Sequence, residues 1–228
     1  MPPTPDAELA IFDHDGVLVD SLECHQQAWF ELERRTALGL TPEFIHATFG
    51  MTNPSIFRRL LGDAITEAEI QRYGDLKEEC YRAVARGRIH LMDGVRAVLD
   101  ALTARGVKLA IGSSGPRANL ELTVAECGLE GRFAAIAALE DITRGKPDPQ
   151  IFLVAAAKSG AAPSRSIVFE DAPVGVQAAK AAGMYGVGLT TTHPAPALYE
   201  AGADEVIPNF IGYDVDGLLE RFRARFAL

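Results

Sequence analysis

Cysteine is scarce in this sequence of 228 residues, which holds only Cys24, Cys80 and Cys127. The three are widely spaced, odd in number and without a CxxC pair. Neither a disulfide framework nor a zinc site is therefore expected. We expect reduced thiols, as in a cytoplasmic protein.

Basic residues are outnumbered by acidic ones, and long apolar runs are missing. The chain has 22 Lys and Arg against 31 Asp and Glu, a net charge of −9. Nucleic-acid binding usually needs a basic face, so we expect no nucleic-acid partner. No uncharged apolar stretch approaches the roughly 20 residues of a membrane helix. The N-terminus, MPPTPDAELAIF, lacks the basic and apolar regions of a signal peptide. We therefore expect a cytoplasmic protein with no membrane partner.

What the sequence does contain is a series of short apolar runs that favour strands. They are LAIF (9–12), VKLAIG (107–112), SIVF (166–169), GVGL (186–189) and EVI (205–207). Helical patterns lie between them, at 93–106, 115–128 and 175–183. Strands that alternate with helices predict an α/β protein, with a parallel sheet covered by helices on both faces.

Residues 20–89 interrupt this alternation. They contain amphipathic helical runs such as LECHQQAWFELERR and TEAEIQRYGDLKEECYRAV, and no convincing strand. We predict a helical domain at 20–89, inserted into a catalytic core formed by 1–19 and 90–228. HLMDG (90–94) would return the chain to the core.

Polar residues follow three of the predicted strands where each strand ends. Asp13 and Asp15 follow the first strand, Ser113 and Ser114 follow VKLAIG, and Glu170 and Asp171 follow SIVF. In an open α/β sheet, ligands bind at the carboxyl ends of the strands. A parallel sheet would therefore bring these side chains to one edge.

The charges of these residues indicate which ligands the site would bind. Several carboxylates crowded together cannot all ionise cheaply, so a cation is expected among them. Oxygen-only ligands suit Mg²⁺, which often binds through one or two carboxylates and a substrate phosphate. Lys146, on a loop before a helical run, would add positive charge, and the start of the helix after Ser114 would favour an anion. The set predicts a site for magnesium and a phosphate.

Four segments, in order, resemble the motifs of the haloacid dehalogenase-like (HAD) superfamily. They are FDHDGVLVDS (12–21), IGSSG (111–115), GKPDPQIF (145–152) and FEDAPVGVQAAKAAGM (169–184). The chain is similar to the branch with a helical cap inserted after the first motif, which includes β-phosphoglucomutase and phosphoglycolate phosphatase. The resemblance covers nearly the whole chain and implies a Rossmann-like core with an inserted all-helical cap.

The resemblance also implies roles for the core residues. Asp13 would be the nucleophile that forms an aspartyl-phosphate. Asp15 would protonate the leaving oxygen and later deprotonate the attacking water. Ser113, with Ser114 beside it, would hydrogen-bond the transferring phosphoryl group, and Lys146 would offset its charge.

The same resemblance implies a Mg²⁺ site. Asp13, Asp171 and the backbone carbonyl of Asp15 would bind the ion, and Glu170 would act directly or through a water. The sequence departs from many relatives at Ala172, where they have Ser, which leaves the acids in place. His14 is the variable residue between the two acids and receives no role.

Four residues of the cap match positions that contact substrate in the family. His25 and Trp29 lie in ECHQQAW, Lys77 lies in LKEECY, and Asn53 lies in GMTNPS (50–55). Asn53 stands where the mutase has an arginine that grips a second phosphate. Each of the four could instead be purely structural, in the helical core or on a solvated face.

The sequence thus predicts an enzyme, a Mg²⁺-dependent HAD phosphatase that hydrolyses a small phosphorylated metabolite, such as a sugar or polyol phosphate. A β-phosphoglucomutase-like mutase is the first alternative, because Lys77 keeps part of the grip on a second phosphate. A non-catalytic binding protein on the HAD fold is the second. It is disfavoured because Asp13, Asp15, Lys146 and Asp171 are all present. The sequence gives neither the substrate nor the oligomeric state.

Overall fold

The structure is a computed structural model of the chain and describes residues 6–48 and 52–226. The chain divides into two compact units, one of Met1–Asp20 with His90–Leu228 and one of Ser21–Ile89. Gly50 and Met51 of the GMTNPS segment lie outside the described residues, as do the ends of the chain at 1–5 and 227–228.

The first unit is built on a parallel sheet, which confirms the predicted α/β class. Its strands run in the order β3-β2-β1-β4-β5-β6, and every neighbouring pair is parallel. Their bounds are β1 (Leu9–Phe12), β2 (Lys108–Gly112), β3 (Ala135–Ala137), β4 (Ser166–Glu170), β5 (Tyr185–Leu189) and β6 (Glu205–Ile207). All but β3 correspond to predicted apolar runs.

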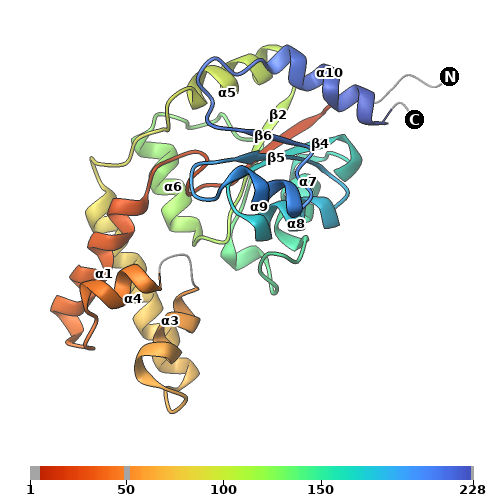
Figure 1. Cartoon of the computed structure of the whole chain (residues 1–228). Helices are drawn as coiled ribbons and strands as arrows, with labels where there is room; N and C mark the ends of the chain where they lie inside the picture. The colour runs from red at the N-terminus through yellow and green to blue at the C-terminus, as the bar shows by residue number, and fades with distance from the viewer. Residues whose placement is uncertain (1–5, 49–51, 227–228) are drawn as a thin grey trace. The chain divides into compact units, whose positions relative to one another are not determined.

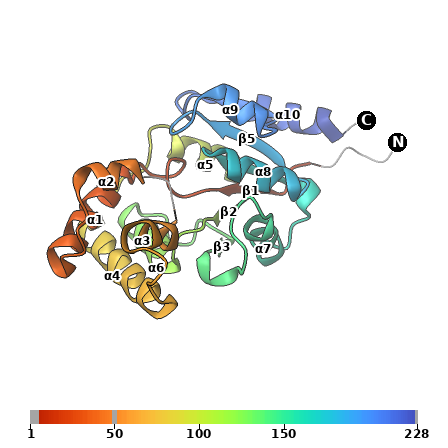
Figure 2. The same cartoon turned by 60° about the horizontal axis from the view of Figure 1, so that its bottom comes forward.

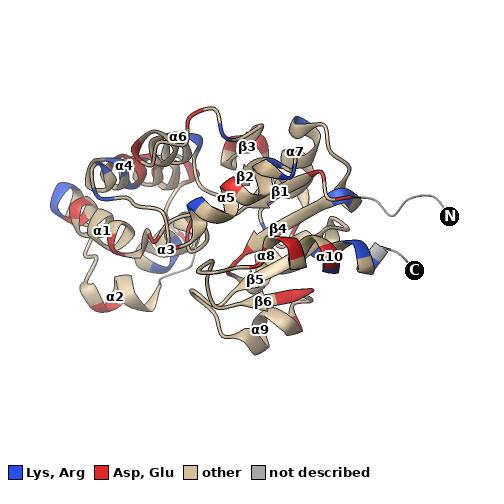
Figure 3. Ribbon diagram, turned by 90° about the horizontal axis from the view of Figure 1, so that it is seen from above, with Lys and Arg blue, Asp and Glu red and all other residues tan. Residues whose placement is uncertain are grey.

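Helices cover both faces of the sheet, as Figure 1 shows. On one face lie α5 (Val95–Ala104) and α10 (Val215–Phe226); on the other lie α7 (Gln150–Ser159), α8 (Pro173–Ala181) and α9 (Ala195–Glu200). Figure 2 shows α7 beside β3 at the end of the sheet, and α6 (Arg117–Glu126) also contacts β3. Short 3-10 turns occur at Leu139–Asp141 (η1) and Pro163–Arg165 (η2). The ribbons of β1 and β5 are tan in Figure 3, because neither strand contains a charged residue.

The centre of the sheet is held by aromatic packing that also aligns the ends of β1 and β4. Phe12 pairs with Phe169 across the two strands, and their rings stack with centroids 4.7 Å apart. The ring of Phe210 packs edge-on against Phe169, at 5.3 Å. Each such buried side chain contributes about 1.5–3 kcal/mol through loss of exposed apolar surface. The residues that follow Phe12 and Phe169 are therefore held at the same height along the two neighbouring strands.

The second unit is helical, with no strand among its described residues. It contains α1 (Leu22–Thr36), α2 (Pro42–Ala47), α3 (Asn53–Leu61) and α4 (Glu67–Ala85). Thr66 and Glu69 form a capping box that starts α4, so both satisfy backbone N–H groups that a helix start leaves open. Its core is apolar and consists of Trp29, Leu32, Leu40, Ile45, Ile56, Phe57 and Ile70.

Within the sheet unit, the two segments that lead to and from this helical unit run side by side. Val19 forms an antiparallel bridge with Leu91, and Met92 donates its N–H to the carbonyl of Leu18 at 2.9 Å. In the part of the chain that the structure describes, no helix is both long and apolar enough to span a membrane.

Candidate active site

Three acidic side chains meet at the carboxyl ends of β1 and β4. Asp13 follows β1, its N–H donating to the carbonyl of Phe169 at 3.0 Å, while Glu170 ends β4 and Asp171 comes next. All three residues are buried, and one carboxylate oxygen from each lies within 4.8 Å of the others. We call Asp13, Glu170 and Asp171 the acid cluster.

Lys146 reaches the acid cluster from the loop before α7. Its Nζ lies 2.8 Å from Asp13 Oδ1 and also contacts Glu170. Burial lowers the pKa of the ammonium, but Asp13 and Glu170 together raise it above its ordinary value. Lys146 therefore stays charged between two carboxylates.

The acid cluster holds more negative charge than Lys146 balances. Burial raises the pKa of Asp13 to about 6, although Lys146 opposes the rise. Burial, followed by the charge of Asp13, raises the pKa of Asp171 to about 6. Burial also raises the pKa of Glu170. Three carboxylates and one ammonium leave two negative charges, which one divalent cation would balance. The all-oxygen donor set fits Mg²⁺.

Two glycines make room for these carboxylates. A Cβ at Gly175, near the start of α8, would overlap the Glu170 carboxylate. A Cβ at Gly16 would overlap Asp171 Oδ2, and the φ of +74° at Gly16 is one that other residues rarely adopt. Both glycines lie inside recognised motifs, but sequence alone did not show that they contact acids.

A threonine loop after β5 also contacts the site, and sequence reasoning missed it. The Thr192 hydroxyl donates to Asp171 Oδ2 at 2.5 Å, and the Thr191 hydroxyl donates to the carbonyl of Gly16 at 2.6 Å. Hydrogen bonds of this kind orient metal-binding carboxylates. TTTH (190–193) directly follows a predicted strand. The strand-end rule that selected the acids could therefore have selected this loop.

Asp15 is not part of the acid cluster, and its side chain is 42% exposed. Its Oδ1 lies 3.0 Å from Nδ1 of His14, and Nε2 of His14 lies 2.7 Å from Oγ1 of Thr123. Burial lowers the pKa of His14, but the neighbouring Asp15 raises it to a net value above the ordinary one. The residue without a predicted role thus contacts one of the predicted site residues.

The two predicted phosphate-binding serines lie between β2 and α6. Ser113 is buried, and its Oγ accepts the N–H of Gly115 at 3.1 Å, while Ser114 is exposed. The helix itself begins only at Arg117, whose N–H donates to the carboxylate of Glu140 at 3.0 and 3.1 Å. A side chain of the protein therefore already accepts the first amide of that helix.

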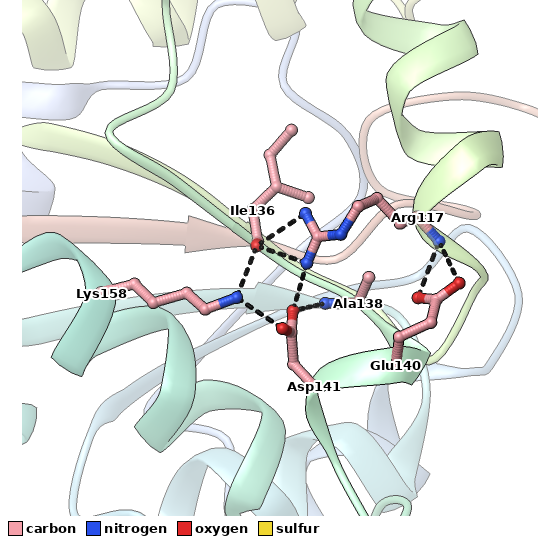
Figure 4. A network of polar contacts seen from close by, with 6 residues as sticks. All are labelled: Arg117, Ile136, Ala138, Glu140, Asp141 and Lys158. Carbon is pink, nitrogen blue, oxygen red and sulfur yellow. Dashed lines mark hydrogen bonds and ion pairs between the residues drawn. The ribbon is translucent and has the colours of Figure 1, made fainter.

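A polar network fixes the segment that precedes the Lys146 loop (Figure 4). Asp141, in η1, contacts Arg117 at 2.5 Å and Lys158 at 2.6 Å, and it accepts the N–H of Ala138 at 2.9 Å. The Arg117 guanidinium also donates to the carbonyl of Ile136 at 3.4 Å. The chain leaving β3 is therefore tied to both α6 and α7 before it reaches Lys146.

The four predicted cap residues lie in the helical unit, where Lys77 contacts His25 and Trp29, and Glu78 links Lys77 to Asn53. Lys77 Nζ is 2.8 Å from His25 Nδ1, 2.9 Å from Glu78 Oε1 and 5.5 Å from the centre of the Trp29 ring. The side-chain amide of Asn53 donates to the same Glu78 oxygen at 2.9 Å. Sequence reasoning missed Glu78, because adjacent residues on a helix do not usually face each other.

Comparison with known proteins identifies the family. Residues 7–183 match the family model described as haloacid dehalogenase-like hydrolase. The chain belongs to this family of enzymes, as its motifs predicted. Among solved structures, it resembles a HAD hydrolase of family IA, variant 3, from Entamoeba histolytica. That likeness has a TM-score of 0.84 and 26% identity, and it covers 95% of this chain and 99% of the other.

Its curated relatives include phosphatases and a mutase. Hexitol phosphatase A of Escherichia coli is 35% identical over 83% of this chain and 86% of its own length. The chloroplastic 5-amino-6-(5-phospho-D-ribitylamino)uracil phosphatase of Arabidopsis thaliana is 32% identical over 87% of this chain, but the match spans only 53% of that longer protein. The β-phosphoglucomutase of Bacillus subtilis is 29% identical over 86% of this chain and 87% of its own length.

Proposed function

We propose that this protein is a Mg²⁺-dependent phosphatase that hydrolyses a sugar or polyol phosphate through an aspartyl-phosphate at Asp13. The observation that carries the proposal is the buried contact of Asp13 with Lys146, beside two further acids at the carboxyl ends of β1 and β4. A carboxylate that must attack a phosphate needs such a cation, because phosphoryl transfer depends mainly on positioning and charge compensation.

The residues divide the reaction between them. An Asp13 oxygen attacks phosphorus while the bond from phosphorus to the leaving oxygen breaks, and Asp15 gives that oxygen a proton. Water then attacks the phosphorus of the aspartyl-phosphate while Asp15 takes its proton and the bond from phosphorus to the Asp13 oxygen breaks. Phosphate is released and the free Asp13 carboxylate is restored. Lys146 offsets charge on the transferring group, and Ser113 and Ser114 hydrogen-bond its oxygens.

The acid cluster and the backbone carbonyl of Asp15 would hold the Mg²⁺. When bound, the ion supplies the positive charge that lets a carboxylate and a phosphate occupy one small volume. The fit rests on the charge surplus described above and on the absence of any nitrogen or sulfur donor in the acid cluster.

We propose that the helical unit at 20–89 acts as a cap that selects the substrate, through His25, Trp29, Asn53 and Lys77. Two relatives are named for a hexitol and for a phosphorylated ribityl compound, which supports a phosphorylated polyol or sugar. The mutase remains the second candidate, because Lys77 is buried in the helical unit and one relative is a β-phosphoglucomutase. In the helical unit Glu78 contacts Lys77, and Asn53 is neutral, which favours hydrolysis of a monophosphate.

The deciding experiment compares Asp13→Asn with the wild type on p-nitrophenyl phosphate, in Mg²⁺ and in EDTA. We expect turnover only in the wild type with Mg²⁺, and a variant that is still folded, with a cooperative thermal melt. Asp100→Asn, on the exposed side of α5, is the control for loss of one carboxylate and should keep full activity. Activity of Asp13→Asn within about tenfold of wild type, only ~1.4 kcal/mol of barrier, would contradict the nucleophile assignment.

A second assay separates the two candidates. The enzyme is incubated with β-glucose 1-phosphate and a catalytic amount of glucose 1,6-bisphosphate, and both glucose 6-phosphate and free phosphate are followed. We expect phosphate release. Rapid formation of glucose 6-phosphate without phosphate release would make the protein a mutase.

A further inference from the structure

His14 lies between the two acids of the first motif and is enclosed by protein. The residue is 1% exposed, and each ring nitrogen has a partner: Nδ1 lies 3.0 Å from Asp15 Oδ1, and Nε2 lies 2.7 Å from Thr123 Oγ1. Thr123 lies on α6 and is itself fully buried. The imidazole therefore joins the buried face of α6 to the half-exposed carboxylate of Asp15.

The chemistry of these partners fixes the direction of the hydrogen bond between His14 and Asp15. An ionised carboxylate can only accept, so Nδ1 of His14 donates to Asp15. In the neutral imidazole the other nitrogen is then an acceptor, and the Thr123 hydroxyl donates to it. In the imidazolium, Nε2 instead donates to the Thr123 oxygen. In both forms, hydrogen bonds link Thr123 to His14 and His14 to Asp15, and His14 does not have to change its charge.

The main chain of His14 is held as firmly as its ring. Its carbonyl accepts the N–H of Leu18 at 2.9 Å and that of Val19 at 3.1 Å, which closes the turn after Asp15. The side chain of Asp15, by contrast, is 42% exposed, against 11% for that of Asp13. A half-exposed carboxylate samples several rotamers unless a partner selects one. His14 is an anchored partner that can do so.

We infer that His14 is a positioning residue that fixes the Asp15 carboxylate for its acid-base role. Because Oδ1 accepts the His14 N–H, the proton of the acid form is carried by Oδ2. That proton passes to the ester oxygen as the phosphorus–oxygen bond breaks and Asp13 bonds to phosphorus. His14 gives up no proton itself. The inference rests on the proposed function of Asp15.

Two esters of nearly equal shape provide the test. p-Nitrophenolate leaves without the help of a proton, whereas phenolate, a stronger base, needs one. A defect in the acid therefore lowers kcat/KM for phenyl phosphate more than for p-nitrophenyl phosphate, while a general loss of structure lowers both equally. The value of kcat/KM reports the steps up to departure of the alcohol, so hydrolysis of the aspartyl-phosphate does not enter it.

Three substitutions probe the chain of hydrogen bonds. His14→Leu removes both ring contacts. We expect the ratio of kcat/KM for phenyl phosphate to kcat/KM for p-nitrophenyl phosphate to fall about tenfold, which is a part of the 10²–10⁴ that acid-base catalysis typically supplies. His14→Asn keeps a donor near the Nδ1 position and should recover most of the ratio. Thr123→Val keeps the shape of α6 and the imidazole but removes the outer hydroxyl, so we expect a smaller fall of the same sign.

The outcome for Asp15→Asn separates failure of this inference from failure of the proposed function. Suppose that Asp15→Asn changes the ratio, but His14→Leu and Thr123→Val lower kcat/KM equally for both esters or do not lower it at all. His14 then has only a structural role, and the inference is wrong. If Asp15→Asn itself leaves the ratio unchanged, the acid-base assignment fails first. Should His14→Leu not fold, Thr123→Val and His14→Asn still decide the question.

Discussion

Replacing Gly175 by alanine tests the close approach of α8 to the acid cluster. Gly175 lies in the first turns of the helix with an ordinary helical backbone, so alanine creates no backbone strain there. On its own, Gly→Ala inside a helix stabilises by about 1 kcal/mol. The new Cβ, however, would lie 2.5 Å from Glu170 Oε2 and closer still to Oε1. The carboxylate must move.

Glu170 has little freedom to move without losing its partners. Its carboxylate contacts Lys146 and accepts the N–H of Ala172 at 2.8 Å, in surroundings that leave the residue 2% exposed. Breaking a buried ion pair of this kind costs about 3–5 kcal/mol. After the helix gain of about 1 kcal/mol is subtracted, Gly175→Ala should be about 2–4 kcal/mol less stable than wild type.

The matched control is Gly74→Ala in α4, where a new Cβ meets nothing within 4 Å. We expect that variant to gain up to about 1 kcal/mol. Unfolding by urea in EDTA measures the stability of both variants and the wild type. In a separate experiment on the folded proteins, phosphatase activity is titrated with Mg²⁺. Gly175→Ala should also need more Mg²⁺ for half-maximal activity. Equal stability of the two alanine variants would refute the reasoning, because the helix gain would then be unopposed.

Three further predictions follow from the charges. In the metal-free protein, the pKa values of Asp13 and Asp171 are raised from 3.8 to about 6. The stability that protonation of these two groups contributes is therefore fully present below about pH 4 and is lost as pH rises through 6. Saturating Mg²⁺ should therefore raise the melting temperature more at pH 7 than at pH 5, and Asp171→Asn should shrink that difference; an equal rise at both pH values would contradict it. Lys146→Met should bind beryllium fluoride, a mimic of a phosphoryl group on a carboxylate, at least tenfold more weakly than the wild type in a titration with Mg²⁺ present. Unchanged binding would show that Lys146 does not contact the phosphoryl group. Asn53→Arg alone should tighten the binding of glucose 1,6-bisphosphate little, because Glu78 would pair with the new charge. The double variant with Glu78→Gln should bind it about tenfold more tightly than the wild type, as measured by calorimetry.

The parallel sheet was predictable because its strands are short apolar runs separated by helical patterns. LAIF and EVI gave the bounds of β1 and β6 directly. β3 was missed because it is only three residues long, and two of the three residues of its AIA sequence are alanine, which has little strand preference. Of the site, the strand-end rule located Asp13 and Glu170, since parallel strands in register carry the residues after them to one edge.

The contacts that sequence reasoning missed join residues far apart in the chain. His14 and Thr123 are 109 positions apart, and Thr191 reaches Gly16 across 175. No local pattern marks such a pair, because each residue alone reads as an ordinary buried or loop residue. Glu78 was missed for the opposite reason, since its lysine partner is its own neighbour in the sequence.

The surplus charge of the acid cluster also implies an order of binding. A phosphate dianion that enters the metal-free site meets the two negative charges that Lys146 leaves unbalanced, at distances where like charges repel strongly. With a divalent cation in place the site is neutral, and the dianion then meets Lys146 and the Ser113 loop. Inorganic phosphate should therefore raise the melting temperature in Mg²⁺ but not in EDTA. The same shift in both conditions would mean that Lys146 and the loop hold phosphate without the cation. The acid cluster would then have to be largely protonated at neutral pH, against the pKa values of about 6 for Asp13 and Asp171.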